Sequence, residues 1–309
     1  MTLAHFEEVL DLVVSLPPLQ AAVVDAGEEC VLRGACEAHD HGLIEPVLIG
    51  DKSRIEELLE TMRSASGDRY AFRIISASNS EEAAEKGVEM AIAGEAQIVI
   101  KGHLHSDVFL HSILAKLRTR HRLSHVFIAE LKTYDKLLFI TDSAVNISPD
   151  LRDKAAILQN VIDLAHLLGI AEPQVACISA VEVINPAIPS TIDAACLAKM
   201  ADRGQIIGAL VDGPLAFDNA ISAESARVKG IRSSVSGHVD ILLVPDLVSG
   251  NILAKDLEYL AGATLAGIVL GARVPIILTS RSDPPRARLV SAALAVLIND
   301  RLSKKSGSS

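Results

Sequence analysis

The sequence of 309 residues has few aromatic side chains and little positive charge. Phe, Tyr and Trp together make up 3% of the chain, tryptophan is absent, and the formal net charge is −10 at pH 7. Nucleic-acid binding needs a basic surface and usually stacking aromatic rings. These absences argue against a nucleic-acid partner, although local cations and helix N-termini can still bind small anions.

Cysteine is also scarce, and no run of residues is long and apolar enough for a membrane span. The four cysteines show no Cys-x-x-Cys spacing, and three lie in apolar or alanine-rich surroundings typical of reduced core residues. The first residues lack the basic segment and cleavage site of a signal peptide, and no apolar run reaches the ~20 residues of a transmembrane helix. We therefore expect a cytoplasmic protein with no membrane partner.

What the chain does contain is aliphatic residues in alternating strand and helix patterns. Half of the residues are apolar, which suits parallel strands that helices cover on both faces. Strands spaced by helices predict βαβ crossovers, and nine strands exceed a typical single sheet, so we expect two α/β domains. The predicted strands are 46–49, 72–76, 97–100, 125–129, 137–141, 174–179, 206–211, 239–244 and 275–278.

A polar segment follows the last predicted strand and precedes an amphipathic pattern over 286–302. It contains Thr279, Ser280, Arg281 and Asp283. Backbone donors and a helix dipole converge where a strand of an open α/β sheet ends and a helix begins. A hydroxyl, a fixed cation and a carboxylate there could bind an anion and move a proton. Asp283 could equally be a helix N-cap followed by proline.

Three further segments also lie between a strand and a helix. Lys101 could bind phosphate with the N–H groups of the following helix, or could be a solvated lysine. Asp212 and Asp218 follow a strand, although Asp218 could merely cap a helix. In the third segment, which includes Asp246, Gly250 would let a ligand approach the backbone closely, and Asn251 would cap or bind.

Several common motifs are missing. The sequence has no Gly-x-Gly-x-x-Gly dinucleotide fingerprint and no Gly-x-Ser-x-Gly nucleophile elbow. His121 and His125 could share a metal if both lay on one helix, but a strand-like run begins between them. His39 and His41 precede Gly42 and fit a helix C-terminus. We therefore expect no metal site.

Taken together, these segments and several other short motifs, here called blocks, resemble the phosphate acetyltransferase/phosphate butyryltransferase family. They occur in the family's order and cover about two thirds of the chain. Pro214 and the Thr-Ser-Arg-x-Asp form resemble the butyryl branch more than the acetyl branch. The matching blocks are Lys101-Gly102, Asn185-Pro186, residues 199–205, residues 212–215, residues 245–247 with 250–252, and residues 279–281.

The resemblance implies two three-layer α/β/α domains of the isocitrate/isopropylmalate dehydrogenase type with a cleft between them. We expect residues 1–143 plus 269–309 to form the first domain and 144–268 to form the second, which would carry the contacts of a homodimer. The implied reaction is acyl-CoA + phosphate ⇌ acyl phosphate + CoA, with acetyl or butyryl as the acyl group. CoA is a substrate, and no bound cofactor is implied.

The resemblance also implies roles for individual residues. A carboxylate takes the proton of the CoA thiol, whose pKa of ~8.5 keeps it mostly protonated at neutral pH. The thiolate attacks the acyl phosphate, Ser280 donates to the oxyanion, and Arg281 binds phosphate with a two-pronged hydrogen bond. Asp283 is the candidate base. The substrate-binding candidates are Lys101, Ser106, His111, Asp212, Asp218, Asp246, Gly250, Asn251 and Thr279.

Two positions depart from the family pattern. His111 stands where the family usually has an arginine, and a neutral imidazole cannot replace a guanidinium fork. Ala287 occupies the position of the proposed base in acetyl-type relatives. These departures motivate an alternative, a catalytically impaired, CoA-binding regulatory relative. A metal- and NAD-dependent decarboxylating dehydrogenase of the same fold is a further alternative, although its paired metal-binding aspartates are missing.

Overall fold

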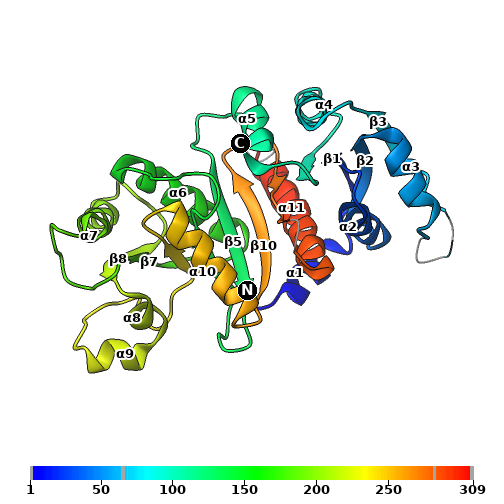
Figure 1. Ribbon diagram of the computed structural model, residues 1–309. Coiled ribbons are helices and arrows are strands. Elements are labelled where there is room, and N and C mark those ends of the chain that lie inside the picture. Colours follow the sequence, from blue (N-terminus) through cyan, green and yellow to red (C-terminus); the bar gives the residue numbers. More distant parts are fainter. Residues whose placement is uncertain (1–2, 64–66, 68, 281–282, 307–309) are drawn as a thin grey trace. The chain divides into compact units, whose positions relative to one another are not determined.

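The computed structural model describes residues 3–63, 67, 69–280 and 283–306 (Figure 1). The chain forms two compact units. Phe6–Arg120 and Ala266–Ser309 make up what we call the N-terminal unit, and Met1–His5 with His121–Leu265 make up the central unit. Each unit contains strands and helices, as predicted. The domain boundaries at 143/144 and 268/269 stay a prediction.

In the N-terminal unit the strands lie in the order β3-β2-β1-β4-β11-β10. All neighbouring pairs are parallel except β10 and β11, which are antiparallel. Because β2 and β4 lie on opposite sides of β1, the order of strands reverses between β1 and β4. The bounds are β1 (Leu19–Val24), β2 (Ile44–Gly50), β3 (Arg73–Ser76), β4 (Ile98–Lys101), β10 (Thr264–Leu270, in this unit from Ala266 onward) and β11 (Ile276–Ile277).

Helices cover both faces of this sheet. Val23 and Leu48 point to a core shared with α2 and α3, whereas Val24 and Ile49 contact Gly87 of α4 on the other face. This alternation is the period of two that a strand imposes. The helices are α1 (Phe6–Val13), α2 (Glu29–Asp40), α3 (Lys52–Glu60), α4 (Ser80–Ile92), α5 (Ser106–Lys116) and α11 (Pro285–Ser306).

The central unit has strands in the order β5-β6-β9-β7-β8. The pair β5 and β6 is antiparallel and the other pairs are parallel. The strands are β5 (Ser124–Glu130), β6 (Leu138–Thr141), β7 (Gln174–Ile178), β8 (Leu210–Leu215) and β9 (Ile241–Leu243), and the helices are α6 (Leu151–Leu167), α7 (Pro189–Asp202), α8 (Phe217–Ile221), α9 (Ala223–Val228) and α10 (Leu247–Tyr259).

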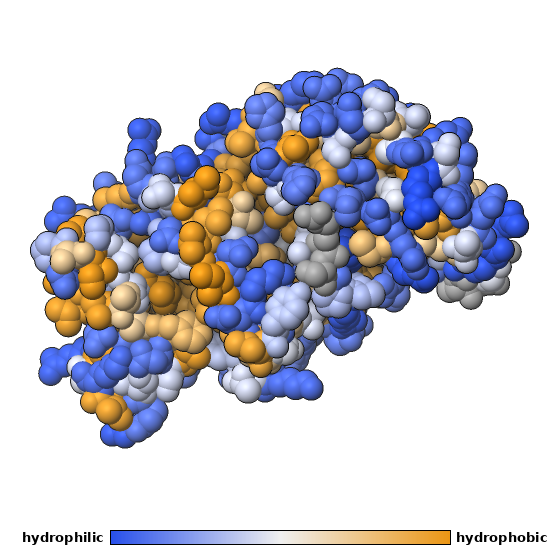
Figure 2. All heavy atoms as spheres, in the orientation of Figure 1, coloured by the Kyte–Doolittle hydropathy of each residue, from blue (hydrophilic) through white to orange (hydrophobic). Residues whose placement is uncertain are grey.

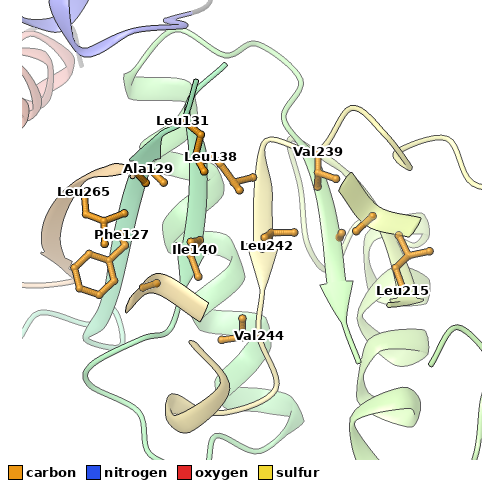
Figure 3. Close-up of a cluster of buried hydrophobic side chains, with 14 of the residues drawn as sticks. Phe127, Ala129, Leu131, Leu138, Ile140, Leu215, Val239, Leu242, Val244 and Leu265 are labelled. Atoms are coloured by element: carbon orange, nitrogen blue, oxygen red, sulfur yellow. The ribbon is translucent and has the colours of Figure 1, made fainter. Parts of the chain in front are cut away.

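One hydrophobic core of the central unit lies between its sheet and α10. Phe127, Ile140 and Leu242 from three different strands belong to it, together with Ala254 of α10 (Figure 3). Each of these side chains is at most 6% exposed. Burying a large aliphatic or aromatic side chain contributes about 1.5–3 kcal/mol, so this layer fixes the strand ends that carry polar residues.

Several predicted elements shift in the structure. The predicted strand 206–211 is wrong over residues 206–209, because β8 begins at Leu210. The sequence did not predict two of the strands, β1 and β10, and β1 lies between β2 and β4 in its sheet. Within the described ranges, no helix is long and apolar enough to cross a membrane.

The four cysteines are free thiols, but only two of the three predicted core positions are buried. Cys36 and Cys177 are buried, whereas Cys196 is half-buried and Cys30 is exposed. Burial raises the pKa of the Cys36 thiol to about 12, and burial likewise raises the pKa of Cys177 to about 12. Both folded-state pKa values lie above the unfolded value near ~8.5. Each thiol therefore contributes its full stabilisation of the folded state below pH ~8, where it is neutral in both states, and this contribution is lost as the pH rises toward 12.

We predict that Cys30 reacts with a thiol reagent at pH 8 at least ~100-fold faster than Cys36 or Cys177. The buried thiols are inaccessible, and at that pH roughly one in ten thousand would be thiolate. Mass spectrometry after timed labelling of the native protein measures this difference, with labelling in denaturant as the control. Equal rates at Cys30 and Cys36 would contradict the burial described here.

Candidate functional site

The reversal of strand order in the N-terminal unit brings Lys101 beside the end of β1. Lys101 is the last residue of β4 and pairs with Val24 of β1. The next two amides, of Gly102 and His103, donate to the carbonyls of Val24 (2.8 Å) and Asp25 (3.0 Å). Open α/β sheets bind ligands at this kind of switch point, outside the carboxyl ends of the strands. Lys101 is only 3% exposed, so it is not the solvated lysine of the alternative interpretation.

Gly102 is required at this junction by close backbone packing. A Cβ atom on Gly102 would lie 2.2 Å from the carbonyl oxygen of Val24 and 2.3 Å from that of Asp25. Asp25 has a positive φ of 57°, and its carboxylate accepts a hydrogen bond from Ser80 Oγ at the start of α4 (2.8 Å). The end of β1 is thereby tied to β4 and α4 at once.

The segment after β11 reaches the same edge of the sheet. Strand β11 runs parallel to β4, with Ile277 opposite Ile100, so Thr279 and Ser280 follow at the carboxyl end beside Lys101. The Ser280 amide donates to Asp283 Oδ2 (2.7 Å), and the Asp283 amide donates to the Ser280 carbonyl (3.2 Å). Arg281 lies outside the described residues.

Asp283 does not occupy the predicted N-cap position. Helix α11 begins at Pro285, two residues beyond Asp283, and the Asp283 carboxylate closes the turn at Ser280 instead. The position of the family's proposed base, Ala287, is buried in α11. The structure therefore brings Lys101, Thr279, Ser280 and Asp283 to one sheet edge and places a carboxylate next to Ser280.

A buried arginine that the sequence did not single out also contacts this segment. The guanidinium of Arg288 donates from Nη1 to Thr279 Oγ1 (3.1 Å) and from Nη2 to the Ser280 carbonyl (2.9 Å). The only signal in the sequence was its place near the start of the last amphipathic helix. Spacing alone could not show which helical face carries it.

Ser106 and His111 lie on α5, and both are exposed. His111 lines an open pocket of about 360 Å³ together with the carboxylates of Glu81, Glu85 and Asp107. Carboxylates repel phosphate, so these neighbours do not favour an anion. The predicted role of His111 in phosphate binding stays a prediction.

In the central unit, a buried aspartate follows β6. Asp142 is 2% exposed and accepts four hydrogen bonds, from the amides of His125, Ala144 and Val145 and from Nδ2 of Asn146. Burial raises the pKa of Asp142, while these donors oppose the shift. Asp142 was not among the residues that the sequence motifs singled out.

Gly250 packs against this turn rather than lying in a loop. The prediction of a strand-to-helix loop at Gly250 and Asn251 is wrong, because both lie within α10. A Cβ atom on Gly250 would lie 2.7 Å from the Asp142 carbonyl oxygen and 2.8 Å from Ser143 Oγ. The glycine lets α10 approach the turn, whereas Asn251 is exposed.

Asp246 is the N-cap of α10. Its carboxylate accepts from the amide (2.8 Å) and the hydroxyl (2.7 Å) of Ser249. Burial opposes ionisation of Asp246, but the hydrogen bonds from Ser249 outweigh it, so the pKa of Asp246 is lowered. A carboxylate in this position stabilises the helix N-terminus, and its predicted contact with substrate stays a prediction.

Asp212 and Asp218 have local partners. Asp212 lies inside β8 rather than after it, and its Oδ1 accepts from the amide of Gly213 (2.8 Å). Asp218 accepts from Ser225 Oγ (2.5 Å) and pairs with Lys229 Nζ (2.8 Å). The hydrogen bonds from Lys229 and Ser225 lower the pKa of Asp218 to about 2. Helix α8 has Ala216 as its N-cap, so Asp218 does not cap it.

The secondary structure decides between the interpretations given for the histidine pairs 39/41 and 121/125. His41 is the C-cap of α2, and Gly42 follows with φ of 68°, as predicted. His125 lies in β5, after α5 has ended at Lys116, so His121 and His125 do not share a helix. In the described part of the chain, no group of three His, Cys, Asp or Glu side chains could hold a metal ion.

Comparison with known proteins identifies the family. The model of the family described as "Phosphate acetyl/butaryl transferase" matches residues 56–296. The chain belongs to the phosphate acetyl/butyryl transferase family. It is 48% identical to a phosphate acetyltransferase of Rickettsia typhi, over 97% of this chain and 86% of that protein. It is 42% identical to a phosphate butyryltransferase of Clostridium acetobutylicum, over 95% of this chain and 97% of that protein.

A solved structure supports the same assignment. The branched-chain phosphotransacylase of Enterococcus faecalis V583 matches with a TM-score of 0.78 and 27% identity, over 91% of this chain and 99% of that chain. The predicted α/β fold is thereby confirmed, and dehydrogenases share it at lower similarity. The higher identity to the acetyltransferase does not support the butyryl branch that Pro214 favoured.

We predict that Gly102→Ala destabilises this family member by at least about 2 kcal/mol, because the new Cβ overlaps two backbone carbonyls. Gly27→Ala is the matched control: its Cβ would meet Arg54 Cγ at 3.7 Å, an ordinary contact, and should change stability by no more than about 1 kcal/mol. Urea unfolding of both variants measures the difference. Equal midpoints would contradict the close approach of β4 to β1.

Proposed function

We propose that this protein catalyses acyl-CoA + phosphate ⇌ acyl phosphate + CoA, with acetyl or butyryl as the acyl group. The observation that carries the proposal is family membership along most of the chain, through relatives whose names state this transfer. These relatives do not favour the impaired regulatory protein or the decarboxylating dehydrogenase. The sheet edge of the N-terminal unit supplies groups suited to the chemistry.

In the proposed mechanism, the phosphate group binds at the edge where β4 and β11 end. The buried ammonium of Lys101, the hydroxyl of Thr279 and the guanidinium of Arg281 would offset its charge. A cation at a largely buried position interacts more strongly with an anion than one in bulk water. The low exposure of Lys101 and Thr279 supports this assignment.

The acyl group is transferred by direct attack. A base removes the proton of the CoA thiol, the thiolate attacks the carbonyl carbon of the acyl phosphate, and the C–O bond to phosphate then breaks. Ser280 would donate a hydrogen bond to the oxyanion of the tetrahedral intermediate, a contact that is strongest in the transition state. Asp283 is the candidate base because its carboxylate lies beside Ser280.

The predicted homodimer and cytoplasmic location are part of the proposal. One face of α10 exposes Val248, Ile252 and Tyr259, each at least 55% exposed. Hydrophobic side chains gather on the surface around this helix (Figure 2). An exposed apolar patch often marks an interaction surface, and we assign this face to contact with a second copy of the chain.

We predict that acetyl-CoA or butyryl-CoA releases free CoA only when phosphate is present, and that Ser280→Ala lowers kcat by about 100- to 1000-fold, the usual loss for one oxyanion donor. Chromatography of stopped samples detects CoA directly. It avoids a thiol reagent, which would also react with Cys30. Ser303→Ala is the control, since Ser303 is an exposed residue of α11. Phosphate-independent release would reject the transferase, and near-normal turnover in Ser280→Ala would remove Ser280 from the site.

We predict that Ile252→Glu weakens dimerisation at least ~100-fold, because burying an unpaired charge at an interface is strongly unfavourable. Sedimentation velocity would find the wild-type chain near twice its mass of 32.8 kDa and the variant near that mass. Leu114→Glu, an exposed hydrophobic position on α5, is the matched control. A dimer that survives Ile252→Glu would place the interface elsewhere.

A further inference from the structure

Arg288 runs from α11 back to the end of β11. It is the fourth residue of α11 and is 9% exposed. Its two terminal nitrogens contact neighbouring residues, Nη1 donating to Thr279 Oγ1 and Nη2 to the Ser280 carbonyl. A guanidinium presents its donors in a rigid planar fork, so this pair of bonds fixes two consecutive residues at once.

The backbone of Ser280 is held from both sides. Its amide donates to Asp283 Oδ2, and its carbonyl accepts from the Asp283 amide as well as from Arg288. These bonds fix the backbone from which the Ser280 hydroxyl projects.

The space around Arg288 is closely filled on two sides. Arg288 and Thr279 line a cavity of about 20 Å³, which has room for a water molecule. On its other side, a Cβ atom on Gly34 of α2 would lie 2.8 Å from Arg288 Cδ. The absence of a side chain at Gly34 makes room for the arginine.

We propose that Arg288 is a positioning residue for acyl transfer, which fixes the Thr279–Ser280 backbone so that the Ser280 hydroxyl meets the developing oxyanion. This inference rests on the proposed function. A misplacement of about 1 Å can cost 100-fold in rate, so we expect the loss of the fork to lower turnover through the position of Ser280. Gly34→Ala would act at the same place, through the arginine.

The test compares Arg288→Lys with Arg286→Lys. Both keep the positive charge, but only the first replaces the fork that contacts Thr279 and Ser280, because Arg286 is paired with Glu7 at the surface. We expect Arg288→Lys to lower kcat about 10- to 100-fold with the KM for acyl-CoA within about twofold, and Arg286→Lys to retain wild-type kinetics. In a Ser280→Ala background, Arg288→Lys should lower kcat by less than about threefold, since the two act as a unit.

Amide hydrogen exchange at Ser280 gives a readout that does not depend on activity. We expect Ser280 to exchange at least ~10-fold faster in Arg288→Lys than in Arg286→Lys, with unchanged exchange in the β5 and β6 strands. Unchanged exchange at Ser280, an equal rise throughout the chain, or full turnover in Arg288→Lys would each overturn the proposal. If the wild-type protein shows no phosphate-dependent CoA release, the proposed function fails, and exchange at Ser280 still decides whether Arg288 holds this segment.

Discussion

The close approach of β4 to the end of β1 is the constraint on which the N-terminal unit depends. Gly102 allows two consecutive amides after β4 to bond to the carbonyls of Val24 and Asp25. These bonds satisfy backbone groups that would otherwise lack partners at the strand ends. They also fix the direction in which the chain leaves toward α5, and they bury the Lys101 side chain at the reversal of strand order. The position of the Lys101 ammonium therefore depends on the absence of a Cβ atom at residue 102.

Local hydrogen bonds fix the positions of polar groups in both units. Ser280 is held by Asp283 and Arg288, and Asp142 is held by amides of its own turn and by its neighbour strand. Donors and acceptors fixed before substrate arrives need no reorganisation during the reaction, which is the main way that enzymes stabilise charge. The cores beneath these turns make the arrangement rigid, because close-packed side chains allow little movement of the strand ends.

The sequence predicted the fold class, the family and most strands, but it failed where packing decides the outcome. Strand β1 (Leu19–Val24) follows two prolines and includes two alanines, which have weak strand preference. Gly250 and Asn251 are turn-forming residues, yet Asp246 starts α10 before them, and contact with Asp142 requires the glycine. Sequence motifs could not identify Arg288, because its hydrogen-bond partners depend on how α11 packs against the end of β11.

The surroundings of His111 decide how much its difference from the family's usual arginine matters for phosphate binding. An arginine at this position would stand on an exposed face of α5 beside Glu81, Glu85 and Asp107, where water and these carboxylates would weaken its attraction for phosphate. At about 4 Å, two unit charges interact by roughly 1 kcal/mol in bulk water and roughly 4 kcal/mol near a protein surface. Lys101 is almost fully buried at the sheet edge, so a phosphate there would gain more from Lys101 than from residue 111. The histidine is therefore compatible with an active transferase.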